Sequence, residues 1–401
     1  MIRLVIKNGK FYLSCLLAFT AGHVTNYSVI LFSQDFLKSD FLSGVGFGLC
    51  FGPPLILGWV AGVWCDRISP IKIIHAGGAV FILSNLLLLA GAQQGSPAAA
   101  VPWILSGAFF AGVAWSFVSP ARMTALRLFM SESDLKPASL FFNLLVMLGF
   151  GLGPMVIAFV RTRSNWNWVF MTAMVFFVIS SALLLNLKTR SASAEKGAKK
   201  RTVTQDVLTG IQAVTGNRYL RELMICAVFG YMLMGPLQVI VPKLATRQLG
   251  LSELERGSLL GALAPSFIVG GALCAVLMKK IRNGWLILAS IALAAVCFGL
   301  LSQYKTVQIA TALISGVGIM GGIAISTIVS LIQAHASDAT RGRVTSMYTI
   351  TSQVMPAVSG LLSGILIHKF GEVHAALTVG VFLFLAMLLH TVWMKNLRSL
   401  P

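Results

Sequence analysis

The chain has 401 residues, of which 57% are apolar and only 11% are charged. A soluble protein carries about 25% charged residues, so this composition excludes an ordinary soluble enzyme and indicates a membrane protein. The formal net charge of +19 would suggest a nucleic-acid partner in a soluble chain, but in a membrane protein it is first a signal of topology.

Apolar stretches long enough to cross a bilayer follow one another along the whole chain. A spanning helix needs about 20 mostly apolar residues, and only helices or closed barrels satisfy their backbone in lipid. These stretches are too long and too continuous for barrel strands, so the predicted class is an all-α membrane protein. The twelve predicted transmembrane helices are residues 11–33, 41–64, 72–92, 102–128, 137–160, 167–187, 222–245, 257–278, 285–303, 308–333, 344–368 and 374–394.

The basic residues are unevenly shared between the loops. Most of the 31 Lys and Arg residues lie on the side that holds both termini, which the positive-inside rule assigns to the cytoplasm. The excess charge is therefore explained by topology and by anionic lipid, and no nucleic-acid partner is expected. The six cysteines lie in or beside separate apolar runs without a CxxC spacing, so neither a disulfide framework nor a metal site is predicted. The first span lacks the cleavage site of a signal peptide and is expected to remain.

The chain divides into two halves around its longest polar stretch. We predict a six-helix bundle over 1–187, a cytoplasmic linker over 188–221 and a second six-helix bundle over 222–401. Within the linker, apolar residues at helical spacing predict an amphipathic helix on the membrane surface; they are Val203, Val207, Ile211 and Val214. Ser133-Asp134 and Ser337-Asp338 begin weakly similar segments half a chain apart. Two pseudo-symmetric six-helix bundles are the architecture of many secondary transporters.

The stretch GWVAGVWCDR, residues 58–67, ends an apolar run in an acid-base pair. It resembles the GxxxDR loop motif of the major facilitator superfamily, and that resemblance extends over the whole chain. Gly58 and Gly62 are expected to let two helices approach closely, and Asp66 can stabilise the N-terminus of a neighbouring helix through its dipole. The resemblance implies that this neighbour is span eleven. The resemblance implies a cytoplasmic gating latch. Its predicted residues are Gly62, Asp66, Arg67, Arg122, Arg127, Arg341 and Arg343.

A second group of motifs narrows the resemblance. GFGLGP, residues 149–154, is similar to the GxxxGP core seen in proton-linked exporters, although a plain small-residue packing face explains it equally well. SPARMTALRLFM, DVLTGIQAVTGNRYLR and RGRVTSMY, in this order, resemble the bacterial enterobactin-exporter-like branch. This branch implies export of siderophores or similar amphipathic molecules through the bacterial inner membrane by proton antiport. The Arg within span four that couples protons in drug-exporting relatives is missing, so their coupling route is not carried over.

Ionisable residues inside a span are costly unless paired or wet, and therefore suggest function. All twelve acids lie at span ends or in loops. The predicted proton-coupling residues are His23, which could also be a neutral packing histidine, and Asp35. Polar residues at helical spacing could face a substrate cavity, or could simply join helices; they are Tyr27, Gln34, Tyr231, Gln238, Ser330 and Gln353.

Motifs of soluble catalysis are missing. No HExxH, Ser-His-Asp arrangement or phosphate-binding glycine loop is recognised, so we predict a transporter that is not an enzyme, needs no cofactor and functions as a monomer in the bilayer. Because no acid lies at mid-span to compensate a cation, the expected substrate is anionic, zwitterionic or neutral. A multidrug exporter, a metabolite uptake transporter and a non-transporting membrane sensor remain alternatives.

Overall fold

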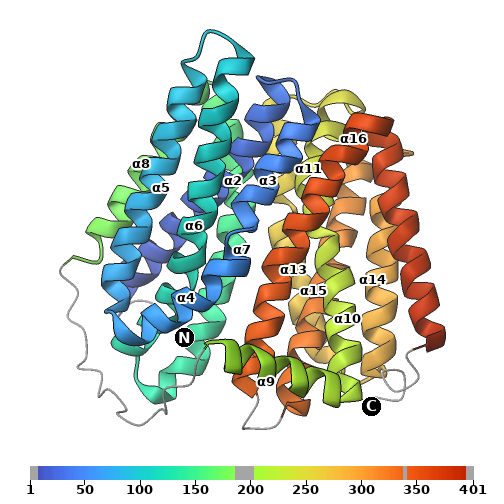
Figure 1. The fold of residues 1–401 in the computed structure, drawn as a ribbon. Helices are drawn as coiled ribbons and strands as arrows, with labels where there is room; N and C mark the ends of the chain where they lie inside the picture. Colours follow the sequence, from blue (N-terminus) through green and yellow to red (C-terminus); the bar gives the residue numbers. More distant parts are fainter. Residues whose placement is uncertain (1–7, 186–202, 337–340, 394–401) are drawn as a thin grey trace. The chain divides into compact units, whose positions relative to one another are not determined.

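The computed structural model describes residues 8–185, 203–336 and 341–393, which fold into α-helices joined by short loops (Figure 1). The chain divides into two compact units. The first unit is Met1–Ala198 together with Ser252–Gly261, and the second unit is Lys199–Leu251 together with Ala262–Pro401.

The first unit contains the first six spans and one helix from later in the chain. Its helices are α2 (Gly9–Asp35), α3 (Asp40–Phe51), α4 (Pro54–Arg67), α5 (Pro70–Ala92), α6 (Pro97–Phe129), α7 (Glu132–Arg161), α8 (Trp166–Ala182) and α12 (Glu253–Gly261). The α2 helix is packed against α3, α7 and α8, and nearly all of its residues are buried. It is therefore the central helix of this unit.

The second unit contains the remaining helices. They are α9 (Val203–Gly216), α10 (Arg218–Met232), α11 (Met234–Arg247), α13 (Leu263–Leu277), α14 (Asn283–Leu300), α15 (Val307–His335) and α16 (Arg341–Trp393). The long α16 consists of two helices that meet at Gly371, whose φ of 79° and ψ of 165° are not helical. A positive φ of this size suits glycine because it has no Cβ.

Local sequence signals explain where several helices begin. The side chains of Ser39 and Ser96 accept hydrogen bonds from the backbone N–H groups of Leu42 and Ala99, at 3.2 and 3.3 Å. Asn217 does the same at the start of α10. Such caps satisfy N–H groups that have no partner within the helix.

The predicted twelve spans agree with the fold. Ten stretches in the described residues are long and apolar enough to cross a membrane. One of them, Arg343–Trp393, contains the bend at Gly371 and so counts as two. The shorter apolar helix Trp166–Ala182 is the remaining predicted span. The described residues therefore confirm an all-α, multi-pass membrane protein.

Three predicted spans are not single helices. Span two is divided between α3 and α4 at Gly52 and Pro53, and spans seven and eight are divided after Met232 and Gly261. Prolines explain all three breaks because a proline has no N–H to donate to the carbonyl four residues earlier. Pro236 stands four residues after the end of α10, and Pro265 four residues after the end of α12.

The linker is described only in part. Residues 188–202 lie outside the described residues, whereas α9 is a helix over the stretch predicted to be amphipathic. It packs against α16 within the second unit. Its predicted place on the membrane surface stays a prediction.

Candidate functional site

The α2 helix carries a row of buried polar side chains in the middle of the first unit. Thr20, His23, Asn26 and Tyr27 are each at most 7% exposed. Thr20, His23 and Asn26 follow one another every three residues, and Tyr27 stands four residues after His23. These residues therefore lie on adjoining faces of the helix. The predicted residues His23 and Tyr27 are thus brought together, and Asn26 is an addition that the sequence reasoning missed.

Aromatic rings from α6 and α7 enclose this polar row. The ring centroid of His23 lies 5.2 Å from that of Trp115 and 5.3 Å from that of Phe150. Trp115 Nε1 donates a hydrogen bond of 3.2 Å to Asn26 Oδ1. The tyrosine ring of Tyr27 lies 5.9 Å from Phe150. These centroid distances are typical of favourable aromatic pairs.

Several polar atoms in this row have no hydrogen-bond partner among the described residues. They are Thr20 Oγ1, both ring nitrogens of His23, Asn26 Nδ2 and the Tyr27 hydroxyl. Buried polar groups in proteins are nearly always hydrogen-bonded, because an unpaired group costs about 1–3 kcal/mol. These atoms are therefore not satisfied by the residues that the structure describes.

The GFGLGP segment packs on two sides. A Cβ at Gly149 would lie 2.7 Å from Phe19 Cβ, and one at Gly153 would lie 2.9 Å from His23 Cβ, so these glycines let α7 approach α2 closely. On another face, a Cβ at Gly257 of α12 would meet Ala158 and the Pro154 carbonyl. Small residues thus place α7 between α2 and α12, which accounts for this motif by packing.

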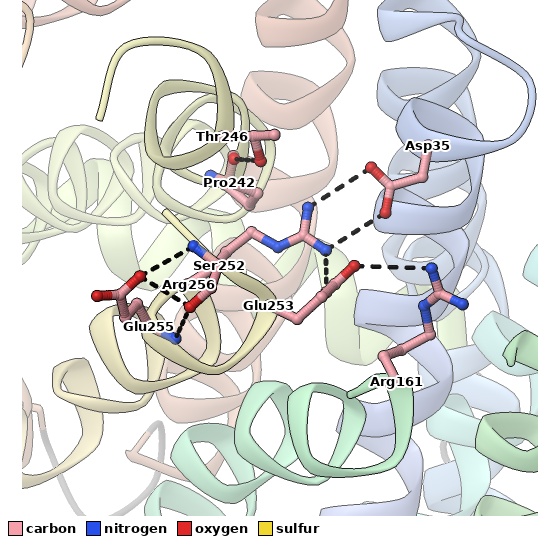
Figure 2. A network of polar contacts seen from close by, with 8 residues as sticks. All are labelled: Asp35, Arg161, Pro242, Thr246, Ser252, Glu253, Glu255 and Arg256. Atoms are coloured by element: carbon pink, nitrogen blue, oxygen red, sulfur yellow. Dashed lines mark hydrogen bonds and ion pairs between the residues drawn. The ribbon is translucent and has the colours of Figure 1, made fainter. Parts of the chain in front are cut away.

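Four charged side chains join the ends of three helices in the first unit (Figure 2). Arg256 Nη2 of α12 lies 3.3 Å from Asp35 Oδ2, at the last residue of α2, and 2.5 Å from Glu253 Oε2. Glu253 Oε1 also lies 3.6 Å from Arg161 Nη2, at the last residue of α7. We call these four residues the charge network.

The charge network follows from the helix ends it occupies. Arg161 at the C-terminus of α7 and Glu253 at the N-terminus of α12 interact favourably with the dipoles of their helices. Asp35 is a negative charge at the C-terminus of α2, where the helix dipole is also negative. Arg256 compensates Asp35, and its side chain is only 5% exposed. The pair Arg256–Glu253 lies within one helix, whereas Asp35–Arg256 and Arg161–Glu253 are ion pairs that connect α12 to α2 and α7.

Arg122 is buried inside the first unit without a carboxylate among its described partners. Its Nη1 donates to Ser14 Oγ at 3.0 Å, and its Nη2 donates to Ser180 Oγ at 2.7 Å. Cys15 Sγ lies 3.6 Å from Nη1. The two serines also bond to each other's backbone. Neutral hydroxyls therefore hold this cation between α2, α6 and α8.

The predicted cavity residues of the second unit differ in their surroundings. The hydroxyls of Tyr231 in α10 and Tyr348 in α16 are 2.7 Å apart. Gln238 is buried, and Gln353 is partly buried. Ser330 is exposed and donates to the Ser326 carbonyl of its own helix at 2.8 Å. This hydrogen bond fits a structural role for Ser330 better than a role in a substrate cavity. In the first unit, Gln34 is buried and donates to Ser43 Oγ at 3.4 Å.

Most of the predicted gating latch lies outside the side chains that the structure describes. The surroundings of Gly62 and the side chains of Asp66, Arg67, Arg127 and Arg341 are outside the described part of the chain. Arg343 is partly buried at the start of α16.

One expectation for the latch motif is wrong. A Cβ built at Gly58 would meet nothing within 4 Å, so this glycine does not mark a close helix approach. Gly58 is in α4, after the break at Gly52 and Pro53.

Sequence reasoning also missed Arg256 and Trp115. Glu253 and Arg256 stand three residues apart at the start of span eight, which is the spacing of a helical ion pair. That spacing could have directed attention to Arg256. Its pairing with Asp35 has no local signal, because the two residues are 221 positions apart in the chain.

Two helical units whose described residues form apolar spans, with polar and charged groups inside them, define a multi-pass membrane protein. The sequence matches the Major Facilitator Superfamily over residues 11–360. The chain therefore belongs to the Major Facilitator Superfamily.

Comparison with solved structures agrees with this assignment. A POT family transporter in complex with 5-aminolevulinic acid is similar with a TM-score of 0.79 at 11% identity, over 98% of this chain and 96% of the other. A D-xylose-proton symporter is similar with a TM-score of 0.72 at 14% identity, over 98% and 97%. A bacterial homolog of the human lysosomal transporter Spinster also has a TM-score of 0.72 at 14% identity, over 98% and 96%. At these identities the likeness concerns the fold. A search of curated proteins found no match.

Proposed function

We propose that this transporter exports a small amphipathic molecule from the cytoplasm across the bacterial inner membrane, driven by proton entry. The substrate is anionic, zwitterionic or neutral, and a siderophore with carboxylate or catecholate groups is the leading candidate. In this proposal residues 1–187 and 222–401 are the two bundles of an alternating-access transporter, with both termini and the 188–221 linker in the cytoplasm.

The balance of buried charge supports this substrate class. In the described part of the chain, the buried charged side chains are three basic residues and one acid; they are Arg122, Lys243, Arg256 and Glu222. Glu222 lies in the second turn of α10, near the end of its span. A lipophilic cation would need a buried acid to offset the loss of its hydration.

The pairing of Asp35 is the observation that carries the proposal. Asp35 was the acid most able to serve a cationic substrate, because it stands at the end of the central helix α2. Its carboxylate is already 3.3 Å from the guanidinium of Arg256. A cationic substrate would have to compete with that guanidinium for the Asp35 carboxylate and would bring a second positive charge close to it.

Proton coupling is assigned to the same network in this proposal. Protonation of Asp35 would remove the charge that holds Arg256 to α2, and protonation of Glu253 would weaken the tie to Arg161. Such events change how α12 is held, which is a way to link proton binding to a conformational step. His23 is the second candidate for the coupling proton.

The cytoplasmic latch stays part of the proposal. Asp66 and Arg67, with Arg122, Arg127, Arg341 and Arg343, are proposed to stabilise the state that is closed on the cytoplasmic side. The protein is proposed to work as a monomer, with protons and one small molecule as its partners.

A deletion strain tests the proposed substrate class. We expect the strain to secrete less of its iron-chelating metabolite while its resistance to ethidium and tetraphenylphosphonium stays unchanged. The reference is the same strain carrying the wild-type gene on a plasmid. If deletion sensitises cells to both cations and leaves chelator secretion normal, the protein is a multidrug exporter and the charge argument is wrong.

A further inference from the structure

A groove opens on the surface of the second unit, beside the break in span seven. It has a cavity volume of about 160 Å³ and lies between the α10–α11 break and the two helices of α16 (Figure 1). Pro236, Ser359 and Leu383 form its buried floor, whereas Leu362 and Phe382 at its edge are exposed. The groove is therefore open to the surroundings of the unit.

The position of the groove is encoded in the sequence. Pro236 has no N–H to donate to the carbonyl of Met232, and the helix is broken between these two residues, which both line the groove. Next to the proline, Gly235 lies so close to α16 that an added Cβ would collide with the backbone of Gly360. The hollow thus lies where a broken helix meets a neighbour at close range.

The walls of the groove suit an apolar chain. The hydroxyl of Ser359 on its floor already donates to the Pro356 carbonyl at 3.2 Å. Beyond the groove, Phe382, Leu385 and Leu389 continue along α16 as an exposed apolar surface, which is typical of a helix face that meets lipid. In lipid, an occupant of such a groove is held by van der Waals contact, because no water is released.

Two basic residues stand at one end of the groove, in line with residues that form its walls. Lys369 follows Leu366 by three positions and Leu362 by seven, so these three residues share one face of the first helix of α16. His374 precedes Thr378 by four positions and shares a face of the second helix with it. Both basic side chains are exposed.

The hairpin that joins these two helices is suited to a negative group. Its acid, Glu372, lies 3.3 Å from Arg247 of α11, so its charge is already compensated. His374 Nδ1 lies 3.2 Å from the Phe370 carbonyl, so a protonated His374 would donate to a ligand through Nε2. Lys369 supplies an ammonium group with three donors. Basic groups at a membrane surface attract anionic lipid headgroups.

We propose that the groove and the hairpin bind one anionic phospholipid, with an acyl chain in the groove and the phosphate against Lys369 and His374. A phospholipid supplies both the apolar chain and the negative group that this surface matches. A second copy of the chain fits less well, because a two-fold contact through this face would bring two Lys369 side chains to the same end. The bound lipid would stabilise the packing of α16 against the break between α10 and α11.

Native mass spectrometry tests this proposal because it counts the lipids bound to each molecule. Delipidated full-length protein in detergent is titrated with phosphatidylglycerol and, separately, with phosphatidylcholine that carries the same acyl chains. We expect one phosphatidylglycerol to bind first, with a Kd about fivefold lower than that of phosphatidylcholine, which is the effect of one lysine near a headgroup. Equal binding of the two lipids would show a general lipid layer only and would overturn the inference.

The variant Lys369→Gln tests the headgroup contact. It should raise the Kd for the first phosphatidylglycerol about fivefold and leave phosphatidylcholine binding unchanged. The matched control is Lys280→Gln, which removes another exposed positive charge from the same unit, beyond the end of α13. If both variants weaken phosphatidylglycerol equally, net charge and not a site attracts the lipid, and the inference is wrong.

The variant Thr378→Trp tests the groove. Thr378 is exposed and lines the groove, so the larger ring should fill the hollow, keep the wild-type Tm and abolish the separate first binding step. The control Leu377→Trp adds the same ring at an exposed neighbouring position outside the lining and should keep that step. An unchanged first step in Thr378→Trp would contradict the place of the acyl chain. A dimer that Thr378→Trp removes, with lipid binding unaltered, would assign the groove to a second copy instead.

Discussion

The charge network makes a quantitative prediction about stability. Asp35→Asn alone leaves Arg256 paired with Glu253, and Glu253→Gln alone leaves it paired with Asp35. Because the two carboxylate side chains are 27% and 29% exposed, each single loss should cost about 1 kcal/mol or less. The double variant removes both of these carboxylates from beside a guanidinium whose side chain is only 5% exposed, and breaking a buried ion pair costs about 3–5 kcal/mol.

The prediction is therefore non-additivity. The double variant should lose about 1–3 kcal/mol more than the two single variants together. Heating in detergent can follow this loss with a thiol-reactive dye, because five of the six cysteines are buried in the folded protein. The drop in apparent Tm for the double variant should exceed the sum of the single drops.

A control on the same helix makes the test specific. Glu255 is exposed and its carboxylate accepts hydrogen bonds from the backbone N–H and hydroxyl of Ser252, at 3.0 and 2.7 Å. Glu255→Gln keeps this capping arrangement and should change the Tm little in any background. If the losses for Asp35→Asn and Glu253→Gln simply add, Arg256 is not held by two alternative partners and the reasoning is refuted.

Three further predictions follow from the first unit. Asp66→Asn should raise cysteine accessibility from the cytoplasmic side while expression is maintained, because the closed state loses a stabilising charge; unchanged labelling would count against the latch. Ser14→Ala should lower stability by about 1.5–3 kcal/mol, because Arg122 loses a charge-assisted hydrogen bond, and a Tm equal to wild type would contradict this. Gly153→Ala should destabilise by about 1–3 kcal/mol through overpacking against α2, whereas Gly58→Ala, where an added Cβ meets nothing within 4 Å, should not. Similar Tm values for the two glycine variants would refute the packing argument.

The number of spans could be predicted because lipid leaves few options. Each crossing needs about 20 mostly apolar residues, and the sequence shows each of these stretches. The breaks inside spans seven and eight are also encoded in the sequence, by Pro236 and Pro265. A hydropathy pattern does not show them, because it is insensitive to the backbone N–H that each proline lacks. Prediction from the sequence therefore succeeded for the apolar stretches and missed the breaks within them, although a local residue causes each break.

The site was less predictable because its contacts join distant segments. His23 and Tyr27 were found by helical spacing on one helix, yet their neighbours Trp115 and Phe150 come from other spans. The packing of α12 with the first unit could not be predicted either, since its place in the chain assigns it to the second half. Arg256 was missed for the same reason.

Transport in everted membrane vesicles tests the central claim most directly. The labelled iron-free chelator that the host secretes is added outside the vesicles, and its accumulation is followed with and without an imposed pH gradient that is acidic inside. We predict accumulation that requires both the protein and the gradient and that stops when a protonophore is added. Accumulation that does not depend on the gradient, uptake only in right-side-out vesicles, or no difference from vesicles without the protein would contradict proton-driven export.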